Sequence, residues 1–205
     1  MAKEIVIDTK QLDRLTIELK GFEKEVGEAA YYALNRVIDQ TITQVGRIVP
    51  RYYAIKATEV KESFKGGIKR PSMNDLTANI TSKGHTLSIA HFPHSPTQPP
   101  KRRNYQVRAT IKRSVGRKTI TTDPKPFIAK TGALTEAKIQ YNIFRRLGKE
   151  RLPITVIRTL SIPQMISNEN VEDEIQKFAQ EKFNERLEHE ITRSILNMQK
   201  NIKKG

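Results

Sequence analysis

The sequence predicts an α+β fold: a long N-terminal helix and a long C-terminal helix pack against an antiparallel sheet, and a basic β-hairpin projects from this body. Two observations indicate this class. Apolar residues recur at spacings of three and four near both ends of the 205-residue chain, as they do along one face of a helix. Between these ends, short alternating runs are separated by glycine and proline, which is typical of strands and turns.

The N-terminal part is predicted to be mainly helical. Residues 5–7 form a short strand or an extended arm, and Asp8 or Thr9 then begins a brief helix with apolar positions at Leu12, Leu15 and Leu19. A longer helix follows, with one apolar stripe from Val26 to Val49. We expect it to end at Pro50, because proline has no amide hydrogen for the helical ladder.

The next segment changes from helix to strand. Thr58 is predicted to begin a helix that runs to about Phe64 and ends at the two glycines that follow. The runs 77–82 and 86–91 then have the pattern of a β-hairpin around residues 83–85. Prolines interrupt the segment 91–100 repeatedly, so no regular element is expected there.

A second hairpin is predicted from residues 105–111 and 118–122, which alternate basic with polar and apolar side chains. Because it follows the proline-rich segment, we expect it to project as a flap. Residues 92–124 are therefore interpreted as an insertion, a proline-rich stalk and basic hairpin, in a single domain that spans residues 1–205.

The C-terminal half is predicted to return to the sheet and end in a helix. The runs 127–129, 142–145 and 154–157 are expected to be strands of the main sheet, with Phe144, Leu152 and Ile154 in its core. The final helix follows Pro163, is capped by Asn170 and has an apolar stripe from Val171 to Ile202. Thirty residues of helix measure about 45 Å, more than a small sheet, so its end is expected to pack on another subunit.

The net charge of +15 favours a polyanionic partner such as DNA, RNA, an anionic membrane or an acidic protein surface. No Asp or Glu occurs between Asp75 and Asp123, so the positive charge is concentrated in the middle of the chain. The second hairpin and its stalk supply the candidate contacts to phosphate or to an acidic partner: Lys101, Arg102, Arg103, Arg108, Lys112, Arg113, Arg117 and Lys118. A solvated flap, a phosphate contact and a protein-docking surface all remain open at this point.

Catalytic and metal-binding patterns are scarce. The chain has no cysteine, which excludes disulfides and thiolate chemistry. His91 and His94 have a spacing that metal sites use, but their surroundings are positively charged and repel a divalent cation. Asp75 and Asp123 are each explained by turn chemistry rather than as a nuclease pair. We therefore expect no enzyme, cofactor, metal or small-molecule site, and no apolar run approaches the roughly 18 residues needed to span a membrane.

Several short motifs occur in one order along the chain: Ala33-Leu-Asn-Arg36, Ile55-Lys-Ala-Thr58, Lys125-Pro-Phe-Ile-Ala129, Phe144-Arg-Arg146, Gly148-Lys-Glu-Arg-Leu-Pro-Ile154 and Ser161-Ile-Pro163. Each motif alone is short, and their shared order is the informative feature. From about Gly21 to Leu196, the series resembles the prophage minor tail protein Z family, the tail completion proteins of long-tailed bacteriophages.

The resemblance implies a structural phage or prophage protein that acts in tail completion at the head-proximal end of the tail, as a subunit of a homo-oligomeric ring around the DNA channel. It implies other tail or neck proteins as partners, assembly in the bacterial host cytoplasm and a final place in the virion tail. The family offers no catalytic residue to carry over. The alternative that the charge leaves open is a free basic nucleic-acid-binding protein, and non-specific contact with DNA is compatible with both.

Overall fold

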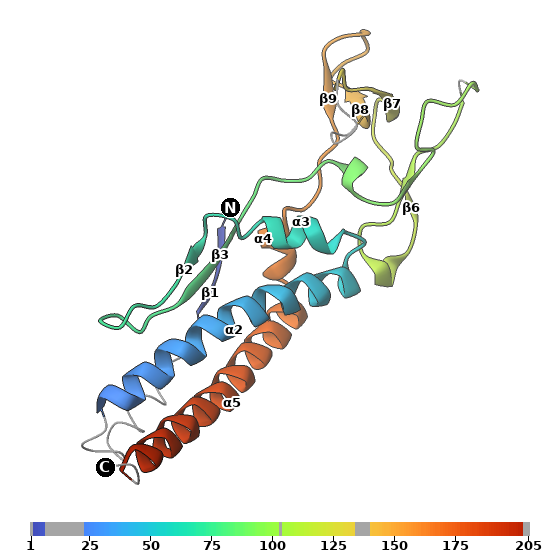
Figure 1. Ribbon diagram of the computed structural model, residues 1–205. Helices are drawn as coiled ribbons and strands as arrows, with labels where there is room; N and C mark the ends of the chain where they lie inside the picture. The colour runs from blue at the N-terminus through green and yellow to red at the C-terminus, as the bar shows by residue number, and fades with distance from the viewer. Residues whose placement is uncertain (1, 7–22, 103, 134–139, 203–205) are drawn as a thin grey trace.

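The computed structural model describes residues 2–6, 23–102, 104–133 and 140–202. Two long helices, α2 (Glu23–Tyr52) and α5 (Glu169–Ile202), run side by side in opposite directions and form one end of an elongated molecule (Figure 1). Three small antiparallel sheets account for its strands. The α+β class predicted from the sequence is confirmed. The brief helix predicted around Leu12–Leu19 lies outside the described residues.

The α2–α5 pair forms most of the main hydrophobic core, and it is the largest contact between two elements. From α2, Leu34, Val37 and Ile38 are fully buried, as the apolar stripe predicts. From α5, Phe183 and Leu187 face them and are equally buried. Complete burial of such side chains is worth roughly 1.5–3 kcal/mol each before entropy is subtracted. The interface is thus the main source of stability in the described chain.

One carboxylate is buried in this interface. Glu190 on α5 is 4% exposed, and its Oε1 atom lies 3.7 Å from Nε of Arg36 on α2. Nη1 of Arg193, one turn further along α5, lies 3.3 Å from the other carboxylate oxygen. Two exposed guanidinium groups therefore cover a buried charge, which would otherwise be strongly unfavourable in a helix interface.

The end of α2 differs from its prediction. The helix continues through Pro50 to Tyr52, and the Tyr53 amide still donates to the Val49 carbonyl at 2.9 Å. Proline removes only its own amide from the ladder, so a helix in its last turn can include one when the following amides remain bonded. The adjacent Arg51 side chain forms an ion pair with Glu174 of α5 and links the two helices at this end.

The helix α3 (Ala57–Glu62) begins one residue before Thr58, with Lys56 at its N-cap and no side-chain cap. The predicted cap at Thr58 is therefore wrong. Gly66 and Gly67 do follow this helix, and they lead into β2 (Ile68–Lys69). A Cβ built on Gly67 would lie 2.1 Å from the Thr81 carbonyl oxygen, so only glycine fits this approach to the next strand.

The first sheet has the order β1–β3–β2, with β1 at Ala2–Val6 and β3 at Asn79–Lys83. β1 thus contains residues 5 and 6 of the strand expected at 5–7, and residue 7 lies outside the described residues. The hairpin predicted from 77–82 and 86–91 is wrong, because β3 pairs with β1 and β2 instead. Residues 87–89 pair with residues 157–160, where the Leu87 and Ile89 amides donate to the carbonyls of Leu160 and Ile157. Residues 89–91 form a short 3-10 helix, η1 (Ile89–His91).

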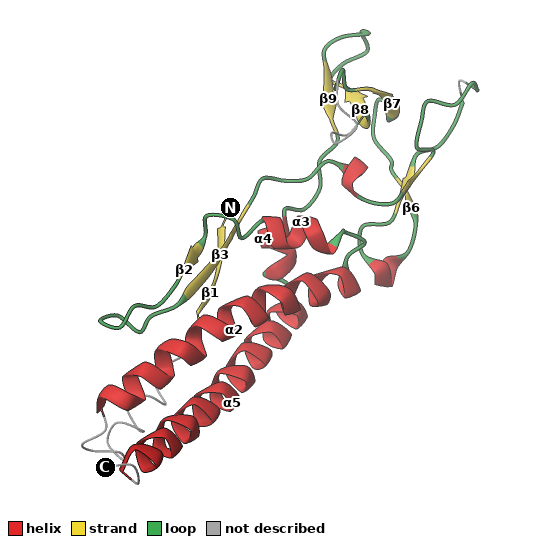
Figure 2. Ribbon diagram, in the orientation of Figure 1, coloured by secondary structure: helices red, strands yellow, loops and turns green. Residues whose placement is uncertain are grey.

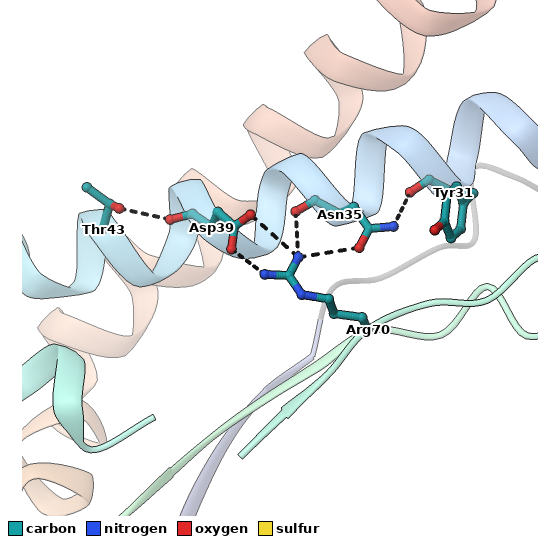
Figure 3. A network of polar contacts seen from close by, with 5 residues as sticks. All are labelled: Tyr31, Asn35, Asp39, Thr43 and Arg70. Carbon is teal, nitrogen blue, oxygen red and sulfur yellow. Dashed lines mark hydrogen bonds and ion pairs between the residues drawn. The ribbon is translucent and has the colours of Figure 1, made fainter. Parts of the chain in front are cut away.

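Arg70, just after β2, attaches the first sheet to α2 (Figure 3). Its Nη2 atom donates to Asp39 Oδ1 at 2.6 Å, and its Nη1 atom donates to Asn35 Oδ1 at 3.3 Å. The Asn35 side chain in turn donates to the Tyr31 carbonyl at 3.0 Å, which fixes its orientation on the helix. Asn35 and Asp39, one helical turn apart, thus hold this loop against α2.

The other two sheets lie beyond α3 and α4, in the region that Figure 2 shows as short strands joined by loops. One has the order β4–β5–β6: β4 (His94–Ser95), β5 (Arg108–Ala109) and β6 (Lys118–Thr119). The other has the order β7–β8–β9: β7 (Phe127–Lys130), β8 (Tyr141–Arg146) and β9 (Ile154–Val156). A second, smaller core joins them through Ile89, Val107, Ala109, Ile128 and Ile143.

These sheets correct two expectations. Strands β7, β8 and β9 exist as predicted, but they form their own sheet and do not return to a single main sheet. Leu152 and Ile154, assigned to the core from the sequence, are 67% and 37% exposed, whereas Phe144 is half-buried. The cause is the register. Arg146 pairs with Ile154, so residues 147–153 form a turn that extends beyond the last paired residues.

The C-terminal elements begin with α4 (Ile162–Ile166), a short helix with a capping box. The Ser161 amide donates to Gln164 Oε1 at 2.8 Å, and the Gln164 amide donates back to Ser161 Oγ at 3.4 Å. The long helix then starts at Glu169, and its first amides are bonded to the Asn168 carbonyl. Asn170 is therefore inside the helix, and its predicted role as the cap is wrong.

We expect Phe183→Ala to lower the free energy of unfolding by about 3–5 kcal/mol, because it removes a fully buried ring from the α2–α5 interface. Met73→Ala, at a position that is 51% exposed, is the control and should stay within about 0.5 kcal/mol of the unmodified protein. Urea denaturation followed by circular dichroism measures both. Equal effects of the two changes would contradict this account of the core.

Candidate functional site

The predicted basic hairpin is present and consists of β5, β6 and the turn between them. Arg108 is opposite Thr119 and Ala109 is opposite Lys118, with the 3-10 turn η2 (Arg113–Val115) at the end. β4 adds a third strand, with Ser95 opposite Arg108. The expectation that residues 91–100 contain no regular element is therefore wrong by this one short strand.

The alternation of side chains along the hairpin separates a buried face from a basic face. Val107 and Ala109 point into the second core and are buried. Arg108 lies between them in sequence and points to solvent, next to Gln106, whose Oε1 accepts from Arg108 Nη2 at 3.3 Å. Every described candidate cation is exposed, namely Lys101, Arg102, Arg108, Lys112, Arg113, Arg117 and Lys118. Their charges are therefore accessible to a partner molecule, because these side chains are not buried in the core.

The turn of the hairpin is held against the end of α2. Lys112 forms an isolated backbone bridge with Tyr53, and the Ala54 amide donates to the Ile111 carbonyl at 2.8 Å. Arg113 Nε donates to the Pro50 carbonyl at 2.6 Å. Pro50, which lacks an amide, thus contributes a carbonyl that secures the turn. Lys112 and Arg113 therefore have a structural role beyond their charge.

The remaining candidates lie at the other end of the hairpin. Lys101 and Arg102 belong to the proline-rich loop that extends from β4 to β5, and this loop is the part that projects furthest from the helices on that side (Figure 1). Arg103 lies outside the described residues. The structure thus brings Arg108, Arg117 and Lys118 together on the hairpin, and places Lys101 and Arg102 beyond them, away from the turn.

The two histidines considered as metal ligands are bound to other groups. His91 Nδ1 lies 2.6 Å from Glu59 Oε2, and His94 Nδ1 lies 2.8 Å from the Phe92 carbonyl oxygen. Glu59 of α3 thus adds an acidic group to the positively charged surroundings that the sequence predicts for His91. Among the described residues, no three His, Asp or Glu side chains form a cluster that could hold a metal ion.

Asp75, one of the two carboxylates considered as a nuclease pair, also has a structural partner. Asp75 lies in the turn after β2, where it accepts a hydrogen bond from Lys69 at 2.9 Å and from the Thr77 amide at 3.1 Å. The hydrogen bond from Lys69 lowers the pKa of the Asp75 carboxyl below its ordinary value. This is the Asx turn expected from the sequence.

A second basic group was missed by the sequence reasoning. Arg145, Arg146, Lys149 and Arg151 are all exposed at the far end of β8 and β9. Arg146 stacks over the Phe127 ring at 5.5 Å from its centroid. The signal was present, because Phe144-Arg-Arg146 and Lys149-Glu-Arg151 are visible in the sequence. From the sequence, only the apolar residues Phe144, Leu152 and Ile154 of this segment are assigned, to a sheet core, and its cations are given no role.

In a comparison with known protein families, the model of prophage minor tail protein Z matches residues 9–200 of this chain. This chain belongs to the prophage minor tail protein Z family. Searches of the curated proteins and of the solved structures found no match. The family is one of structural phage tail proteins and not of enzymes, which places the protein in the virion tail among other tail proteins. Among the described helices, none is long and apolar enough to cross a membrane.

The residues that carry the resemblance have identifiable structural tasks. In Ala33-Leu-Asn-Arg36, the first two side chains are buried in the main core, Asn35 receives Arg70, and Arg36 reaches the buried Glu190. Ser161 caps α4. The segment from Gly148 to Ile154 differs from these, because its apolar and charged side chains alike are exposed. Packing within the described chain therefore accounts for most of these motifs, but not for that one.

Neutralising the exposed group Lys101, Arg108, Arg117 and Lys118 to glutamine should change the free energy of unfolding by less than about 1 kcal/mol, because exposed charges contribute little to stability. Arg113→Gln removes the hydrogen bond to Pro50 and should cost about 0.5–1.5 kcal/mol by itself. Thermal and urea unfolding measure both. A cooperative loss of structure in the four-residue variant would contradict the assignment of these residues to the surface.

Proposed function

We propose that this chain is a tail completion protein that acts at the head-proximal end of the phage tail, as a subunit of a ring around the DNA channel. Membership of a minor tail protein family supports a place in the tail. The observation that carries the finer statement is the exposed, acid-free basic hairpin, held in a fixed position on a rigid helix pair. A cationic surface of this kind suits a site where the protein meets either DNA or an acidic protein ring.

The hairpin is suited to hold DNA without reading its sequence. Arg and Lys side chains contact phosphates independently of the bases, and several copies in a ring would repeat the same cations around the channel. The described candidates lie on polar strands, with Thr119 and Ser95 beside Arg108. The hairpin has a single partly buried aromatic residue, Tyr105, whose hydroxyl accepts from the Ile128 amide at 2.9 Å. It is therefore not a stacking platform for single strands.

The net charge of +15 also favours the second candidate, a free nucleic-acid-binding protein. The two functions differ in where the protein is found. A tail completion protein stays attached to purified tails and is required for particles to become infectious. A free binding protein is absent from tails and associates with duplex DNA with a steep dependence on salt.

The test uses a phage or prophage from which this gene is deleted, complemented by the protein with an affinity tag. We expect deletion to yield tails that fail to form infectious particles, and the tagged protein to restore infectivity by several orders of magnitude. Gold labelling of the tag should mark the head-proximal end of purified tails. Normal particles without the gene, or a label absent from tails, would contradict the proposal.

The role of the hairpin is tested with Arg108→Gln combined with Lys118→Gln, and with the purified protein on a duplex DNA fragment. If the hairpin contacts phosphate, the slope of log K against log salt should fall by about 0.9 for each cation removed. An unchanged slope together with lost infectivity would assign the hairpin to an acidic protein partner instead.

A further inference from the structure

The outer face of the β7–β8–β9 sheet carries half-buried apolar side chains that do not belong to the second core. Phe127, Phe144 and Val156 lie opposite one another across the three strands, so their side chains share one face. The two rings stack with centroids 6.1 Å apart. The opposite face carries Ile128 and Ile143, which are buried in the second core. The outer face therefore is not needed to close that core.

The turn between β8 and β9 extends this apolar surface and surrounds it with cations. Leu147 and Leu152 are 59% and 67% exposed, which is unusual for leucines in a short turn. Arg146, Lys149 and Arg151 are exposed beside them, and the turn contains a single acidic residue, Glu150. We call this surface the outer sheet face. An apolar centre with a charged rim is the arrangement of a protein interface rather than of a solvated loop.

The exposed side of α5 has the complementary properties. Glu181, Glu185, Glu188, Thr192, Ile195 and Leu196 recur at spacings of three and four, so they lie along one side of the helix. Phe183 and Leu187 are on the opposite side, in the main core. We call the exposed residues the acidic helix face.

This face is acidic where it begins and apolar where it ends. Ile195 and Leu196 are 39% and 51% exposed. A shallow hollow of about 590 Å³ lies along it, and its lining contains Glu185, Glu188 and Leu196 together with the cations Arg193 and Lys200. An acidic stretch next to exposed apolar side chains matches the two components of the outer sheet face.

We propose that the outer sheet face of one copy docks on the acidic helix face of a second copy of this chain. Within one molecule the β7–β8–β9 sheet and the C-terminal half of α5 are at opposite ends, so the contact joins two molecules (Figure 1). The two surfaces differ from each other, so the association is head-to-tail and produces a ring if its rotation closes. This proposal rests on the ring assembly in the proposed function and assigns its subunit contact.

Charge segregation along the chain favours a second copy over DNA or an unrelated protein. Residues 169–190 contain eight Asp or Glu and three Lys or Arg, in a chain whose net charge is +15. Two molecules of this charge repel each other unless they meet through oppositely charged surfaces. The acidic helix face is the part of the described chain that can receive a cationic surface. Exposed leucines would gain nothing from contact with a phosphate backbone.

The test is a charge swap, followed by light scattering and sedimentation equilibrium. The turn variant carries Lys149→Glu and Arg151→Glu, and the helix variant carries Glu181→Lys and Glu188→Lys. We expect the wild-type chain to form a closed oligomer larger than a dimer. Each variant alone should self-associate at least about tenfold more weakly, because like charges then meet in the contact.

An equimolar mixture of the two variants should recover the association. In the mixture, the unchanged turn of the helix variant can bind the unchanged helix of the turn variant. The acidic turn of the turn variant can likewise bind the basic helix of the helix variant. A general effect of net charge cannot give this result. The matched control is Lys101→Glu with Arg102→Glu, which changes the net charge by the same amount as the turn variant on a different surface and should leave self-association unchanged.

The apolar part of the contact is tested separately with Leu152→Ser. Because this side chain is 67% exposed, the thermal midpoint should not change, whereas self-association should weaken. The control is Met73→Ser, which is similarly exposed on the turn after β2 and should have no effect on association.

The results separate this contact from the proposed function. If the wild type associates and occupies tails but both charge variants associate normally, the contact is wrong and the function stands. If the variants associate normally but lose binding to isolated tails or DNA, the outer sheet face serves another partner and the proposal is overturned. A wild-type chain that stays monomeric at all concentrations overturns it as well, while the gold label on tails tests the function independently.

Discussion

The antiparallel packing of α2 on α5 is the constraint on which the rest of the structure depends. The loop after β2 is attached to α2 through Arg70, α4 leads directly into α5, and the basic hairpin is bonded to the C-terminal end of α2. The strands of the β4–β5–β6 sheet have only two residues each, so this sheet depends on packing against other elements. Each of the three small sheets gains its position from the helix pair or from an element that the pair holds.

The fold could be predicted from the sequence where it depends on local periodicity. The stripes of α2 and α5 extend over many turns, and burial follows them from Val26 to Val49 and from Val171 to Leu187. Strand pairing could not be predicted equally well. β3 pairs with β2 and with β1, about 77 positions earlier, rather than with residues 86–91, and alternation in one strand does not identify a distant partner. The helix boundaries predicted at Pro50 and Asn170 differ from those of the structure. Backbone hydrogen bonds of the neighbouring residues set these boundaries more strongly than the helix preferences of Pro50 and Asn170 themselves.

The candidate site was predictable as a set of charges but not as a geometry. The acid-free stretch between Asp75 and Asp123 identified cations that are all exposed where the structure describes them. The sequence did not show that Arg113 is bonded to the end of α2, because that contact joins positions 63 apart. It also led to Leu152 being placed in a core, since an alternating pattern does not show where the paired part of a hairpin stops and its turn begins.

Glu190 constrains how α5 is aligned along α2. The buried Glu190 carboxylate lies within ion-pair distance of both Arg36 and Arg193 in this alignment of the two helices. Sliding α5 by one turn, about 5.4 Å, would leave the carboxylate buried away from Arg36. Apolar side chains alone tolerate such slippage far better. The buried charge therefore fixes the axial position of α5 relative to α2. It sets the distance from the C-terminal half of α5 to the sheets, so a neighbour bound at one end of the subunit is held at a fixed distance from a neighbour bound at the other end.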